Sequence, residues 1–173
     1  MTPTPEIKFS SPHPKLGTPY NLAPVNYQGA KIYRAYFRTQ GDKLTALLPT
    51  GIEPLEAGEL FFYGADLPMQ NSAGVYGDTQ EAHRYLEFGL VVPSKVEKPN
   101  GSWIEGMYAL VLYLDPFAYA TPGRERWGWP KKDCVGNIQV DQNGASANLD
   151  VSRGGHKLIE VALQYSQPLK QNM

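Results

Sequence analysis

The chain has 173 residues, of which 42% are apolar and 19% are charged, and its formal net charge is −1. This length and apolar content predict a globular fold with a substantial core, and they argue against disorder. The near-neutral charge gives no electrostatic basis for a nucleic acid or an anionic membrane as partner. No run of about 18 apolar residues occurs, so we expect no transmembrane helix.

The first half of the chain predicts strands and one short helix. Residues 31–38 alternate in the manner of a strand. Three leucines between positions 44 and 48 then have helical spacing, and Pro49 is expected to stop that helix. Residues 59–66 are rich in aromatic side chains and predict a second strand. Residues 83–93 predict a third strand that ends at its proline.

The second half predicts the longest strand and a terminal meander. Residues 103–114 are almost all apolar past Gly106, which is typical of a central strand covered on both faces. Asp115 is expected to cap a short helix ending near Gly123. Alternating segments separated by an Asn-Gly turn and an Arg-Gly-Gly turn then predict three antiparallel strands in residues 134–165.

These elements predict a mainly β (α+β) fold, an antiparallel sheet curled or closed into a β-barrel with two or so short helices outside. Residues 1–20 lack an apolar signal core, so we expect an irregular arm followed by one domain over residues 21–173. The single cysteine, Cys134, excludes an internal disulfide and fits a reducing cytoplasm. The three histidines show no metal-ligand spacing, so no metal is expected; they are His13, His83 and His156.

The segment GRERWGWPKKD, residues 123–133, places Lys131 and Lys132 behind a proline and two tryptophans. An ammonium ion is not a nucleophile, but burial and a second nearby ammonium each lower the pKa of a lysine. A lysine perturbed in this way can attack a ketone and form a Schiff base. Neighbours in an extended segment point to opposite faces, which would leave burial as the main effect. The alternative interpretation is an exposed lysine pair that closes a turn.

The same segment resembles the signature of the acetoacetate decarboxylase family. Four other pieces resemble that family in the right order, so that the likeness covers roughly residues 17–165. They read GTPY, YFRTQGDKLTALLPTGIEP, YLEFGLVVP and YLDPFAYATPGRE. The resemblance implies the β-barrel of this family, a cofactor-free reaction through a Schiff base, and a small oxo or keto acid as substrate.

The resemblance also implies the residues of the site. Lys131 matches the nucleophilic lysine, Lys132 its charge-tuning neighbour, and Glu87 the active-site glutamate that donates or accepts a proton. Alternation along the strand supports the last assignment, because Tyr85 and Glu87 share one face while apolar residues occupy the other. Tyr85, Trp127 and Trp129 are expected to wall the substrate site.

Three features depart from the family pattern. Family members have an arginine that helps to position the substrate carboxylate. Its place in this chain falls near Ala30, and Lys31 or Arg34 could substitute for it. A second family glutamate is replaced in the stretch that contains Phe61, Phe62 and Tyr63. Family members also continue for several strands past the end of this chain. We therefore expect a smaller barrel, a barrel completed by a partner subunit, or a fragment, and a homo-oligomer would cover an exposed sheet edge.

Three functions follow from these observations. The first is a lyase that decarboxylates a β-keto acid such as acetoacetate through Lys131. The second is an aldolase, dehydratase or cyclase that acts on an oxo acid through the same lysine, which the departures from the family pattern favour. The third is a binder of small carbonyl compounds without catalysis.

Overall fold

The computed structural model describes residues 25–71, 83–116, 123–124 and 128–165. The expected N-terminal arm, residues 1–20, lies outside the described residues. The same is true of residues 117–122, the centre of the helix expected after Asp115. Within the described part of the chain, no helix is long and apolar enough to cross a membrane.

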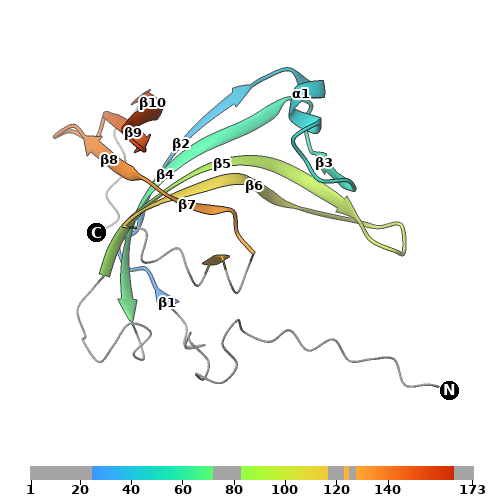
Figure 1. The fold of residues 1–173 in the computed structure, drawn as a ribbon, viewed down its shortest axis with the longest axis horizontal. Helices are drawn as coiled ribbons and strands as arrows, with labels where there is room; N and C mark the ends of the chain where they lie inside the picture. The colour runs from blue at the N-terminus through green and yellow to red at the C-terminus, as the bar shows by residue number, and fades with distance from the viewer. Residues whose placement is uncertain (1–24, 72–82, 117–122, 125–127, 166–173) are drawn as a thin grey trace.

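The larger of two sheets has seven strands and is strongly curved (Figure 1). Its main path runs β1-β4-β5-β6-β7, with β2 paired to β4 and β3 paired to β5. The strands are β1 (Val25–Asn26), β2 (Lys31–Arg38), β3 (Ile52–Pro54), β4 (Glu59–Asn71), β5 (His83–Glu97), β6 (Trp103–Asp115) and β7 (Lys131–Asp133). All pairs are antiparallel except β6 with β7. The predicted mainly β, curled architecture is therefore confirmed, with one parallel pair added.

The smaller sheet is the predicted C-terminal meander. It consists of β8 (Val135–Val140), β9 (Ser146–Arg153) and β10 (His156–Gln164), in the order β10-β9-β8. Both of its pairs are antiparallel, as the two turn signals predict. Figure 1 shows this sheet beside one end of the long strands β4 to β6.

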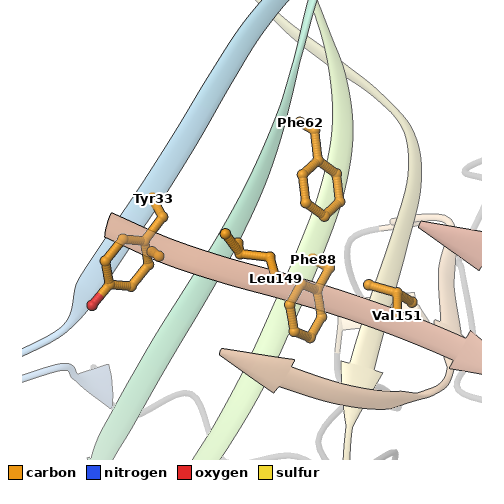
Figure 2. Packing of buried hydrophobic residues seen from close by; sticks show 6 residues of the cluster. Tyr33, Phe62, Phe88, Leu149 and Val151 are labelled. Carbon is orange, nitrogen blue, oxygen red and sulfur yellow. The ribbon is translucent and has the colours of Figure 1, made fainter. Parts of the chain in front are cut away.

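The main core lies between the meander and one face of the larger sheet. Figure 2 shows the rings of Phe62 and Phe88 near Leu149 and Val151, and all four side chains are buried. The ring of Phe88 fills space beside two glycines, Gly64 and Gly136. A β-carbon at Gly136 would collide with this ring. This packing explains why the apolar face of β5 is the face that turns toward the meander.

The helix α1 (Gly41–Thr45) covers another part of the same sheet. It is shorter than the leucine spacing suggests, and it ends before Pro49. Leu44 is buried and packs with Leu60 and Val92, whereas Leu47 is exposed. Leu48, just past the end of the helix, is partly buried and packs against the same cluster.

Two predictions about the long strands are wrong. The strand β5 passes through Pro93 instead of ending there, because the carbonyl of Pro93 still accepts a hydrogen bond from the amide of Leu55 at 2.9 Å. Only one donor is lost at a proline. The strand β6 is covered on both faces only in its second half, and residues 103–107 are exposed. The short partner strand β7 pairs only with the residues near the end of β6.

Candidate active site

The side chain of Lys131 is buried on the face of the larger sheet opposite the meander. Lys131 opens the strand β7 and pairs in parallel with Leu112 of β6. The residue is 5% exposed. Gly123 lies against this side chain, since a β-carbon there would stand 2.6 Å from Lys131 Cε. Gly123, the first residue of the segment GRERWGWPKKD, therefore makes room for the side chain of Lys131.

Glu87 is the ionic partner of Lys131. It lies on β5, two strands from β7, and is 8% exposed. The Nζ atom of Lys131 donates a hydrogen bond to Glu87 Oε2 at 2.8 Å. At this distance the amine and the carboxyl are within hydrogen-bond reach, which is the geometry that direct proton transfer between them requires.

Tyr63 is the residue that sequence reasoning missed. It lies on β4, and its hydroxyl donates a hydrogen bond to Glu87 Oε1 at 2.6 Å. The pKa of Tyr63 is raised, first by burial and then by the charge and hydrogen bond of Glu87. The phenol therefore stays protonated and acts as a donor. Each oxygen of Glu87 consequently has its own partner.

A glycine on the neighbouring strand makes the reach of Tyr63 possible. Tyr63 pairs with Gly89, which shares a face with Glu87. A β-carbon at Gly89 would collide with the Tyr63 ring. The sequence YLEFG carries this signal, since a glycine two residues past a buried glutamate marks space for a side chain from the next strand.

Two aromatic rings flank the amine of Lys131. The centroid of the Trp129 ring lies 4.9 Å from Lys131 Nζ, and that of the Tyr85 ring lies 6.0 Å away. Tyr85 is buried, and its hydroxyl lies 3.1 Å from that of Tyr27. Burial and the hydrogen bond with Tyr27 raise the pKa of Tyr85, which keeps this phenol neutral. Trp129 is 49% exposed, so this ring borders the site on the solvent side.

The structure brings together four of the six predicted site residues: Lys131, Glu87, Tyr85 and Trp129. Lys132 is exposed and lies on the other face of β7, as alternation along a strand requires. Trp127 lies outside the described residues. No cluster of metal-ligating side chains occurs in the ranges that the structure describes.

Comparisons with known proteins identify the family of the chain. The family model described as acetoacetate decarboxylase (ADC) matches residues 12–173. The curated acetoacetate decarboxylase of Ralstonia nicotianae is 30% identical over 163 residues, which cover 88% of this chain and 60% of that protein. That of Paraburkholderia phytofirmans is 34% identical over 113 residues, covering 65% of this chain and 39% of that protein. The chain thus spans 60% or less of the length of these two relatives.

Solved structures show the same fold. The crystal structure of acetoacetate decarboxylase from Legionella pneumophila is 26% identical, with a TM-score of 0.70, and the match covers 94% of this chain and 58% of that one. The enduracididine biosynthesis enzyme MppR, complexed with the condensation product of pyruvate and imidazole 4-carboxaldehyde, has a TM-score of 0.69 at 16% identity. That match covers 95% of this chain and 65% of MppR.

Proposed function

Because the chain belongs to the acetoacetate decarboxylase family, we propose that it is a lyase that decarboxylates a β-keto acid through a Schiff base on Lys131. The observation that carries this proposal is the buried amine of Lys131, 2.8 Å from the carboxyl of Glu87. No other lysine among the described residues is buried. A shielded amine with a proton acceptor beside it is the arrangement that nucleophilic lysine chemistry requires.

The proposed reaction begins with proton transfer from Lys131 to Glu87. The lone pair of Nζ then attacks the ketone carbon, and the proton held by Glu87 passes to the carbonyl oxygen as it becomes a hydroxyl group. Loss of water leaves an iminium ion. The electrons of the bond to the carboxylate carbon flow toward the iminium nitrogen, carbon dioxide leaves, and an enamine forms. Protonation of the enamine carbon and hydrolysis release the ketone and restore the amine.

In this route, the amine of Lys131 is activated by burial and by Glu87, and not by the second lysine, Lys132. Lys132 is exposed on the opposite face of β7, where water screens its charge. Glu87, by contrast, contacts the amine directly. The position of Lys132 therefore argues against the family role of a charge-tuning neighbour for this residue.

Tyr63 is proposed to hold Glu87 in position. Its hydroxyl donates a hydrogen bond to Glu87 Oε1, while Glu87 Oε2 accepts the hydrogen bond from Lys131. Tyr63→Phe is expected to lower kcat by roughly 10- to 100-fold, with a small change in KM, because one hydrogen bond to a charged group is lost. Steady-state kinetics, with kcat and KM measured separately, would check this.

A matched control is Tyr36→Phe. Tyr36 lies on β2, and its side chain is exposed. Its ring packs against Phe61 at a tilt, and it makes no hydrogen bond to the site within the described part of the chain. An unchanged kcat in Tyr63→Phe, or an equal loss in Tyr36→Phe, would contradict the positioning role.

The proposal is tested by borohydride trapping in the presence of acetoacetate, followed by peptide mapping. We expect a reduced adduct on Lys131 and release of carbon dioxide. An adduct on a different lysine would refute the mechanism. Binding of acetoacetate with neither adduct nor carbon dioxide would favour a non-catalytic carbonyl binder.

The second candidate is an aldolase, dehydratase or cyclase that uses the same Schiff base. The observation in its favour is Tyr63, a neutral phenol in the stretch where the family has a second glutamate. A neutral phenol in place of a carboxylate makes the surroundings of the bound acid less negative. This change affects whether the substrate loses its carboxylate as carbon dioxide. Trapping on Lys131 without carbon dioxide release from acetoacetate would favour this candidate.

A further inference from the structure

The nitrogen atom of Lys131 lies close to two aromatic rings as well as to Glu87. The centroid of the Trp129 ring is 4.9 Å from Nζ, and that of the Tyr85 ring is 6.0 Å away. A cation within about 6 Å of a ring centroid is attracted by the negative face of the ring, and tryptophan gives the strongest attraction. Trp129 is therefore the ring that acts most on a positive charge at this nitrogen.

Hydrogen bonds fix the backbone on both sides of Trp129. The amide of Trp129 donates to the carbonyl of Gly123 at 3.1 Å, and its carbonyl accepts a hydrogen bond from the amide of Lys131 at 2.8 Å. The carbonyl of the next residue, Pro130, accepts a hydrogen bond from the amide of Leu112 on β6 at 3.1 Å. This turn keeps the ring close to the amine of the residue two positions further along the chain.

A second contact between a lysine and a tryptophan shows what is particular about Lys131. The Nζ atom of Lys95 lies 4.5 Å from the centroid of the Trp103 ring, so the two contacts have similar distances. The side chain of Lys95 is 34% exposed, however, whereas that of Lys131 is 4% exposed. Cation–π attraction is stronger where the cation is shielded from water. The Trp129 ring therefore acts on a buried charge, and the Trp103 ring acts on one that water reaches.

A positive charge returns to this nitrogen during the proposed reaction. After the amine of Lys131 has attacked the ketone, Nζ returns one proton to Glu87, which leaves a neutral carbinolamine. The carbon–oxygen bond then breaks, and the oxygen takes up that proton and departs as water. The lone pair of Nζ forms the new double bond, so the positive charge of the iminium ion appears at the nitrogen. An iminium group is planar, and an aromatic ring can lie against its face while its N–H donates to a carboxylate.

We propose that the ring of Trp129 stabilises the iminium ion on Lys131 through a cation–π interaction. This inference rests on the proposed Schiff base, and it gives Trp129 a role in catalysis besides that of a wall of the site. The ring favours the iminium ion over the neutral carbinolamine, because only the charged form is attracted by its negative face. Bound substrate therefore accumulates in the form that loses carbon dioxide.

The experiment compares a charged and a neutral adduct of the same amine at one pH. Pentan-2-one forms an iminium ion with Lys131, which borohydride traps. Pentane-2,4-dione loses water to form a neutral conjugated enaminone, which is measured by its ultraviolet absorbance. Both probes start from the same amine, so the protonation of the free amine cancels in the ratio of the two apparent dissociation constants, iminium over enaminone. This ratio is measured in the unmodified protein, in Trp129→5-fluorotryptophan and in Trp129→5,6,7-trifluorotryptophan.

Fluorine withdraws electrons from the indole ring and hardly changes its size, so it weakens the negative face of the ring without opening a cavity. We expect the ratio to rise with each step of fluorination, by roughly 3- to 10-fold in the trifluorinated protein. The matched control is the same pair of replacements at Trp103. Because Trp103 contacts Lys95, these replacements should leave the ratio unchanged.

A constant ratio across the Trp129 series would overturn this inference and leave the Schiff base on Lys131 standing. An equal rise in the Trp103 series would also overturn it, because the effect would then not come from the contact with Lys131. If neither probe forms an adduct on Lys131, the proposed function and this inference both fall.

Discussion

Lys131→Met is expected to abolish the borohydride adduct and to lower the rate of acetoacetate decarboxylation by roughly 10⁴-fold or more, since loss of a nucleophile removes the covalent route altogether. Methionine has a similar length and no charge, so it fills the space against Gly123 without leaving a cavity. The measurement is carbon dioxide release, with mass spectrometry of the reduced protein.

The control for this prediction is Lys132→Met. Lys132 is exposed and faces away from Glu87, so we expect this variant to keep most of the activity and the full adduct on Lys131. A loss in Lys132→Met as large as that in Lys131→Met would contradict the activation by burial and Glu87. It would instead favour charge tuning by the second lysine, the role that the family resemblance implies.

Glu87→Gln is expected to affect both stability and catalysis. The side chains of Lys131 and Glu87 are only 4% and 11% exposed, so removal of the carboxylate leaves a buried ammonium without its counter-charge. Loss of one partner of a buried pair typically costs about 3–5 kcal/mol in the free energy of unfolding. The rate should also fall by roughly 10²- to 10⁴-fold, because the proton acceptor beside the amine is gone. Urea denaturation and carbon dioxide release measure the two effects.

Two further variants test whether the lost stability comes from the buried pair of Lys131 and Glu87. In the double variant Lys131→Met with Glu87→Gln, both charges are absent, so most of the lost stability should return, and the double-mutant cycle measures the coupling. Asp133→Asn removes an exposed carboxylate that pairs with Arg153, two residues further along β7. This surface change should leave the unfolding midpoint nearly unmoved. Additive losses in the cycle would show that the two buried side chains do not stabilise each other.

Local pattern was sufficient for much of the fold. The turn signals between residues 134 and 165 predicted the three-stranded meander, because a hairpin is encoded by a few consecutive residues. Strand ends were predicted less well. The strand β5 continues past Pro93, since hydrogen bonds from neighbouring strands outweigh the loss of one donor.

The amino-acid sequence by itself determined which side chains share a face. A strand has a period of two, so Tyr85 and Glu87 had to point away from Phe88, and Lys132 away from Lys131. Only the tertiary structure decided which faces meet. The pairing of β2 with β4, and of β4 with β5, sets Arg34 and Tyr63 in line with the site. That register depends on contacts between segments far apart in the chain, and no local spacing of residues encodes it.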